Sequence, residues 1–320
     1  MAGGGQSGLG RAFIPGGSMA YTASGAGLRN IPARAIAYIL TASFLIIVLD
    51  TAVKWLAKGY SPLQIGFVRY VMGLFLAAGI ATRAGGIGTL RTRRIGGHLL
   101  RSVVNLTTML SFYYALRLLP LADSIAINFA APLFVTALSG PLLGEHVGIR
   151  RWVAVAFGFG GVLLAVQPSP SGISLGAALA LLSGLCWALT IVTSRQISDT
   201  ESSHTILFYY SLAVVIVLGV AMPRLWIEPS LHDWIWFIVV GISGSFGQFC
   251  YNQAFRYGEA SAIAPLDYLS IVWATLFGFV IFGDIPSWLV LGGAACIVAS
   301  SIYIAHREAL AARKRRAAAP

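Results

Sequence analysis

An acidic and a basic side chain stand one helical turn apart in the apolar stretch IVLDTAVKW. Asp50 and Lys54 are spaced i, i+4, so a helix would place them on one face within ion-pairing distance. Arg69 follows in the next apolar stretch. Two interpretations fit these residues. Either Asp50 neutralises Lys54 or Arg69 and fixes helix packing, or Asp50 and Arg69 bind a charged solute or exchange a counter-ion.

A third acidic group lies far along the chain, in the stretch IAPLDYLS, where Asp267 follows Pro265 by two residues. A proline inside a helix leaves the carbonyl one turn earlier without its hydrogen bond and bends the helix. Asn128 occupies the matching place 139 residues earlier, in INFAAPLF. These two positions predict one polar group on each side of a central site. The alternative is that Asp267 is an interfacial acid paired with Arg256.

Amide and aromatic side chains lie inside several apolar stretches, and in the third and eighth expected helices they recur at helical spacing. They are Asn105, Phe112, Trp187, Tyr210, Gln248, Tyr251, Asn252 and Tyr268. Aromatic faces stack on a ring or hold a cation, and amides fix orientation, so these groups suit a planar or zwitterionic solute. The alternative is close helix packing, with the amides as hydrogen bonds between helices. We adopt packing for the neighbouring glycines and cavity lining for the amides.

These candidates lie in a chain with the composition of a membrane protein. Of 320 residues, 57% are hydrophobic and 10% are charged, against roughly a quarter charged in ordinary soluble domains. The apolar stretches are continuous and often exceed about 18 residues, which favours spanning helices over barrel strands. We therefore predict an all-α integral membrane protein. Its ten expected transmembrane helices are 34–56, 62–82, 97–117, 121–142, 151–167, 173–194, 203–222, 233–255, 261–282 and 287–305.

The distribution of basic residues predicts the orientation. With the amino terminus inside, sixteen Lys and Arg residues fall on the inner side and four on the outer side. The positive-inside rule then places both termini in the cytoplasm and the chain in the cell (inner) membrane as a multi-pass protein. Because the net charge of +11 sits in short connections, we expect no nucleic-acid binding. Residues 1–33 are expected to form a disordered leader and residues 307–320 a basic cytoplasmic tail.

The two halves of the chain resemble each other. A shift of 139 residues aligns 115–134 with 254–273 and places Glu145 on Asp284. Five helices per half is an odd number, so the second half would be inserted upside down relative to the first. Inverted repeats are typical of transporters, because two halves rocking about a midplane site give alternating access. The predicted five-helix repeats are 34–168 and 169–306.

Each unit has a Pro- and Gly-bearing helix, then an acidic residue, Glu145 or Asp284, and then a Gly-rich last helix such as WVAVAFGFGGVLLAV. This pattern resembles the EamA family of the drug/metabolite transporter superfamily, and the resemblance covers residues 34 to 306. Within that family, three stretches are similar to the branch that contains bacterial S-adenosylmethionine uptake proteins and riboflavin importers. They are 49–70, 98–134 and 241–269.

The resemblance implies a secondary transporter and not an enzyme. It would move a small organic metabolite, S-adenosylmethionine-like, riboflavin-like or amino-acid-like, through a midplane cavity by alternating access. A drug/metabolite exporter is the alternative within this class. Outside it, the alternatives are an intramembrane enzyme, for which Asp50 and Asp267 lie on distant helices without a supporting motif, and a structural membrane subunit. The expected partners are a small-molecule solute and the lipid bilayer, with a homodimer as a further alternative.

The remaining reactive side chains predict no cofactor. The three cysteines lie in apolar stretches without metal-ligand spacing, and the five histidines lie near the ends of the expected helices. No GxxxxGK[ST] stretch is present to bind nucleotide phosphates, so we expect a solute or ion gradient to supply the energy.

Overall fold

Helices make up nearly all of the described chain. The computed structural model describes residues 33–83, 95–143, 148–170, 172–197, 203–257 and 260–317. Within these ranges there is no strand, which confirms the predicted all-α class. The helices are α1 (Ala33–Leu56), α2 (Pro62–Arg83), α3 (Ile95–Leu118), α4 (Leu121–Asn128), α5 (Ala131–Leu143), α6 (Ile149–Val166), α7 (Leu175–Ile197), α8 (Ser203–Leu225), α9 (Leu231–Tyr257), α10 (Ala260–Asp267), α11 (Leu269–Phe277), the π-helix η3 (Gly278–Phe282) and α12 (Trp288–Ala317).

The outer surface of the bundle is apolar. Among the described residues, seven segments are long and apolar enough to cross a membrane, and two shorter apolar helices accompany them. Large side chains are exposed on α6, where Trp152, Val153 and Phe157 are 44%, 63% and 56% exposed. Water would disfavour such a surface, whereas lipid tails accept it. The fold is therefore that of a multi-pass membrane protein, while the number of crossings and their orientation remain predictions.

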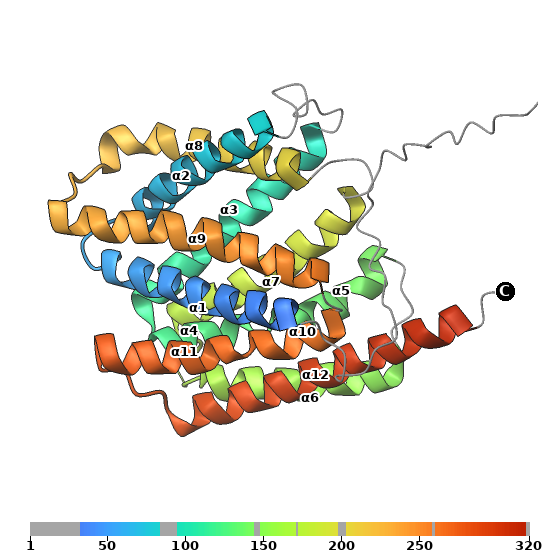
Figure 1. The fold of residues 1–320 in the computed structure, drawn as a ribbon. Helices are drawn as coiled ribbons and strands as arrows, with labels where there is room; N and C mark the ends of the chain where they lie inside the picture. The colour runs from blue at the N-terminus through green and yellow to red at the C-terminus, as the bar shows by residue number, and fades with distance from the viewer. Residues whose placement is uncertain are drawn as a thin grey trace, which may run out of the picture.

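The described chain begins and ends at the same end of the bundle (Figure 1). We call the opposite end the distal end. It is formed by the connections 57–61, 119–120, 167–170 with 172–174, 226–230 and 283–287. The predicted leader lies outside the described residues except for Ala33. At the other terminus α12 continues to Ala317, so most of the predicted basic tail is helical.

The packing of the helices is the same when each helix is exchanged for its equivalent in the other half of the chain. The 139-residue shift relates α1 to α7, α2 to α8, α3 to α9 and α6 to α12. In the structure α1 packs along α9, and α7 packs along α3, which are equivalent pairs under this exchange. The self-equivalent pairs α2 with α8 and α6 with α12 are also in contact. The packing therefore supports the predicted repeat, and the inversion of its halves in the membrane stays a prediction.

Two helices are interrupted at positions that the repeat relates, although we expected one continuous helix in each place. α4 ends at Asn128 and α5 begins at Ala131, whereas α10 ends at Asp267 and α11 begins at Leu269. Pro132 has no N–H to bond the carbonyl of Asn128, so the helical hydrogen-bond pattern stops there. Each half of the bundle thus contains one broken helix, with a polar residue at the break.

Candidate functional site

Arg69 of α2 lies among tyrosines from three helices. Its Nη1 donates a hydrogen bond to the hydroxyl of Tyr113 on α3 at 2.7 Å. Its guanidinium carbon lies 5.3 Å from the ring centre of Tyr70 and 5.9 Å from that of Tyr113, within range of cation–π attraction. The ring of Tyr70 meets Tyr210 of α8 edge-on, with ring centres 5.2 Å apart. The cation is therefore surrounded by aromatic rings and held by one hydroxyl.

A glycine on α9 makes room for this side chain. A Cβ atom at Gly244 would lie 3.1 Å from Nε of Arg69 and 3.5 Å from Leu49, so a larger residue would press on the guanidinium. The guanidinium has five N–H donors. Among the described residues, Tyr113 is its one hydrogen-bond partner. The hydrogen bond to Tyr113 therefore uses only one of these donors.

Asp50 of α1 supplies the negative charge of the same region. Its side chain is 6% exposed, and Arg69 is the cation whose charge acts on it. Within the described part of the chain, no direct ion pair of 4.0 Å or less joins Asp50 to Arg69 or Lys54. We call Asp50, Arg69, Tyr70, Tyr113 and Tyr210 the arginine site. It contains a positive and a negative group that no direct ion pair joins in the described part of the chain.

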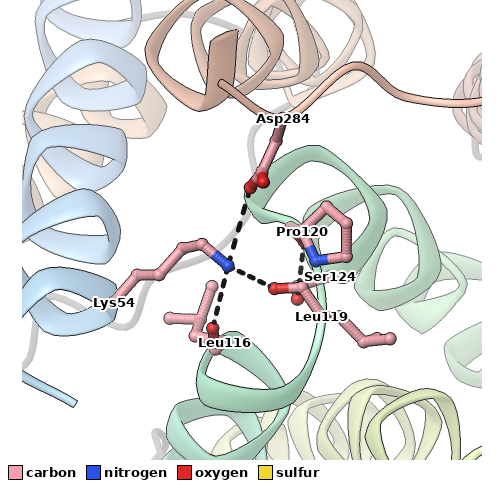
Figure 2. A network of polar contacts seen from close by, with 6 residues as sticks. All are labelled: Lys54, Leu116, Leu119, Pro120, Ser124 and Asp284. Carbon is pink, nitrogen blue, oxygen red and sulfur yellow. Dashed lines mark hydrogen bonds and ion pairs between the residues drawn. The ribbon is translucent and has the colours of Figure 1, made fainter. Parts of the chain in front are cut away.

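Lys54 points away from Asp50, so the predicted pairing of these two residues is wrong. Its Nζ forms an ion pair with Asp284 at 3.6 Å and donates hydrogen bonds to the carbonyls of Leu116 and Leu119 at 3.3 and 2.5 Å (Figure 2). Lys54 has a long side chain and stands in the last turn of α1. It therefore reaches the connection between α3 and α4, whereas the short Asp50 side chain stays inside the bundle.

The two helix breaks contact each other through aromatic residues. Phe129, which follows Asn128, and Tyr268, which follows Asp267, have ring centres 5.0 Å apart. Tyr251 of α9 lies within hydrogen-bonding range of the Asp267 carboxylate. Buried Oδ1 of Asn128 has no hydrogen-bond partner among the described residues. The structure thus brings together these predicted residues in a second polar region, which we call the break region.

The other predicted residues lie apart from these two groups. Asn105 is 9% exposed on α3, two turns before Tyr113, and Phe112 packs against the main apolar core. Trp187 is half-buried on α7. Gln248 and Asn252 are exposed on α9 and bond each other at 3.2 Å. Their roles in a solute pathway stay predictions. The proposed pairing of Asp267 with Arg256 involves a side chain outside the described set.

Sequence reasoning missed Tyr70 and Tyr113, which enclose Arg69, and Asp123, which lies near Lys54. Tyr113 was detectable, because it directly follows the candidate Phe112 in the apolar stretch that also contains Asn105. In the sequence, Asp284 stands out only as the repeat-related equivalent of Glu145. No spacing rule linked it to Lys54, because the two residues are 230 positions apart in the chain.

Two further features bear on the chemistry. A pocket of about 390 Å³ lies at the distal end, and its lining includes Asp123, Gln167 and Ser174. Within the described ranges, no group of three or more His, Cys, Asp or Glu side chains is arranged to hold a metal ion.

An apolar helical bundle with an enclosed cation, a buried carboxylate and two broken helices is typical of membrane transport proteins. The chain belongs to the EamA-like transporter family, whose model matches residues 33–167 and 174–305. The predicted family is thereby confirmed, and the chain is a transporter and not an enzyme.

Curated relatives cover most of the chain at low identity. The S-adenosylmethionine uptake transporter of Rickettsia bellii is 26% identical over 83% of this chain and 91% of its own length. The riboflavin transporter of Vibrio cholerae is 26% identical over 90% and 98%. The pseudopaline exporter CntI of Pseudomonas aeruginosa is 27% identical over 83% and 94%. These relatives are all transporters of small molecules, in both directions.

Proposed function

We propose that this protein is a secondary transporter that moves a small organic metabolite by alternating access and binds it at the arginine site. The observation that carries the proposal is Arg69, with unused N–H donors, beside the buried carboxylate of Asp50. A guanidinium binds a carboxylate through two parallel hydrogen bonds, and a carboxylate attracts an ammonium or sulfonium group. The tyrosine rings add faces for an aromatic or cationic part. This chemistry suits a zwitterion.

The solute class follows from these charges. An S-adenosylmethionine-like or amino-acid-like solute carries both a carboxylate and a cation, so it would engage Arg69 and Asp50 together. A riboflavin-like solute has no such pair and would rely on the tyrosine rings. We therefore rank zwitterions first. Export is the alternative within the class, because one relative is named as an exporter.

The arrangement that we propose is two inverted five-helix repeats, 34–168 and 169–306, with both termini in the cytoplasm and the chain in the inner membrane. The two-fold exchange of packing pairs and the equivalent helix breaks support it. Broken helices at corresponding positions of two halves are a recurrent feature of solute sites in such transporters. Asn128, Asp267 and Tyr268 would then contact the solute from the break region.

Counterflow into liposomes tests this function. Liposomes that contain the purified protein are loaded with unlabelled solute. Uptake of labelled S-adenosylmethionine, a neutral amino acid or riboflavin is then measured. We expect saturable counterflow for a zwitterion. Its methyl ester, which lacks the carboxylate charge, should compete at least about tenfold more weakly, because a hydrogen bond to a charged group contributes about 1.5–3 kcal/mol.

Variants then assign the site. Arg69→Met should weaken binding of the acid and leave binding of the ester nearly unchanged, so the difference between the two ligands disappears. Arg224→Met is the matched control, because this arginine is exposed in the last turn of α8, outside the arginine site. Absence of saturable flux for every solute would overturn the transport proposal. Equal loss of acid and ester binding in Arg69→Met would overturn the role of Arg69.

A further inference from the structure

Lys54 connects three segments at the distal end. Leu116 and Leu119 stand at the carboxyl end of α3, where carbonyl groups lack partners within the helix. The ammonium group of Lys54 donates a hydrogen bond to each of these two carbonyls (Figure 2). The carboxyl end of a helix carries a partial negative charge, so it favours a positive group at this place. Its third interaction is the ion pair with Asp284 at 3.6 Å. Lys54 therefore joins α1, the end of α3 and the connection before α12.

Asp284 is held in place by the local backbone. Gly283 has φ of 72°, a left-handed conformation that glycine adopts without strain, and it ends η3. The amide of Asp284 then donates to the carbonyl of Gly278 at 3.0 Å. The ring of Phe282 lies 5.3 Å from Nζ of Lys54. This turn presents a carboxylate and an aromatic face to the lysine.

The ion pair crosses between the two repeats. Lys54 belongs to the first half and Asp284 to the second. Two other distal contacts cross in the same way, since Gln64 exchanges hydrogen bonds of 2.7 and 3.1 Å with the backbone of Ile227, and Tyr60 donates to Asp233 at 2.8 Å. The distal ends of the two halves are thus held together by polar contacts.

The contact of Lys54 is the one suited to open. Gln64 is fully buried, and its amide both donates to and accepts from Ile227, so separation would leave polar groups unpaired. The ion pair is longer and partly exposed, with side chains 12% and 25% exposed. Asp123 of α4 lies within electrostatic range of both Lys54 and Asp284, and its buried Oδ1 has no hydrogen-bond partner in the described part of the chain. A second carboxylate is therefore available to Lys54 within the first half.

We propose that Lys54 is the latch of a distal gate: it bridges to Asp284 when the gate is closed and transfers to Asp123 when the connection before α12 moves away from α4. The transfer keeps the ammonium group paired in both states, which lowers the cost of opening. The proposal deepens alternating access, so it rests on the proposed function. The structure then represents the state that is closed at the distal end.

A buried cysteine reporter tests the latch without a transported solute. Leu121 is fully buried at the start of α4, and its Cβ lies 3.7 Å from where a Cβ of Gly278 would stand in the other half. Leu121→Cys is made in protein whose three native cysteines are replaced by alanine. Its reaction with a polar maleimide is followed in nanodiscs, where both faces are accessible. Gly59→Cys, exposed with open space around it, reports the intrinsic reagent rate.

Four variants carry the test. We expect Lys54→Met and Asp284→Asn each to accelerate labelling of the Leu121→Cys reporter about tenfold, and their combination to do no more than either alone. Asp123→Asn removes the alternative partner and should slow labelling. Lys58→Met is the matched control, because this neighbouring lysine is exposed and contacts only the rings of Trp55 and Phe282 among the residues described.

The outcomes separate the latch from the transport proposal. Unchanged labelling in Lys54→Met protein that remains monodisperse would overturn the latch, as would equal acceleration by Asp123→Asn and Asp284→Asn. Absence of flux for every solute, with the expected labelling pattern, would overturn the transport proposal and leave the latch standing. Lys54→Arg provides a second check, because a retained positive charge should restore slow labelling if pairing with the carboxylates closes the gate.

Discussion

A double-mutant cycle on Asp50 and Arg69 tests whether the two charges of the arginine site depend on each other. Asp50 is 6% exposed and Arg69 is half-buried, so water hydrates neither fully. Two unit charges ~4 Å apart interact by about 4 kcal/mol at an effective dielectric constant of about 20. No ion pair of 4.0 Å or less joins Asp50 to Arg69, so their interaction stays below this value. Removing one member of a buried pair costs about 3–5 kcal/mol, because the other charge is left without a partner.

We expect Arg69→Met to lower the free energy of unfolding by about 3–5 kcal/mol, since it leaves Asp50 charged in an apolar setting and removes the hydrogen bond to Tyr113. Asp50→Asn should cost less, about 1–3 kcal/mol, because the half-buried Arg69 keeps its hydrogen bond to Tyr113 and its aromatic neighbours. The double variant should be less destabilised than the sum of the single variants by about 2–3 kcal/mol. This difference is the coupling between the charges.

Reversible unfolding in mixed micelles, followed by tryptophan fluorescence, measures these free energies. Tyr113→Phe is the control, because it removes the hydroxyl that bonds Arg69 but no charge. Its effect should couple to Arg69→Met and remain nearly additive with Asp50→Asn. Additivity of Asp50→Asn and Arg69→Met within about 0.5 kcal/mol would refute the reasoning. The two charges would then be independent, and a solute would not have to separate them.

Two predictions concern packing between the halves. Gly161→Ala should destabilise the protein, because a Cβ there would lie 2.8 Å from a backbone oxygen of α12. The control Gly160→Ala faces open space and should be neutral or stabilising. Equal unfolding temperatures of the two variants would contradict the close contact between α6 and α12. Gln64→Leu should lower the free energy of unfolding by about 2–4 kcal/mol, because two hydrogen bonds to the backbone of Ile227 are lost. The same change at the exposed Gln248 should have little effect, and similar losses at both positions would refute the distal contact.

The helices were predictable because continuous apolar stretches leave few alternatives, as α8 illustrates: it begins at Ser203 in both prediction and structure. The faces of the helices were not predictable in the same way. Lipid tails are as apolar as a helix interface, so a stripe such as Gln248 and Asn252 does not reveal which side it faces. The spacing of Asp50 and Lys54 indicated a shared helix face, but the longer side chain reaches the end of α3 and leaves that face. The length of the Lys54 side chain therefore determines its partners, which the i, i+4 spacing to Asp50 could not predict.

The fold and the arginine site differ in symmetry. The 139-residue shift that relates the helices places Asp50 on Leu189 and Arg69 on Phe208, so the second half has no copy of either charge at these positions. The second half contributes uncharged parts to the site, namely Tyr210 and the space beside Gly244. Two halves of like fold can exchange roles during alternating access, yet the charged centre at these positions belongs to the first half. A solute bound through its charges would therefore stay with the first half while contacts with the second half change, which makes contacts between halves, such as Lys54 with Asp284, the natural place to control access.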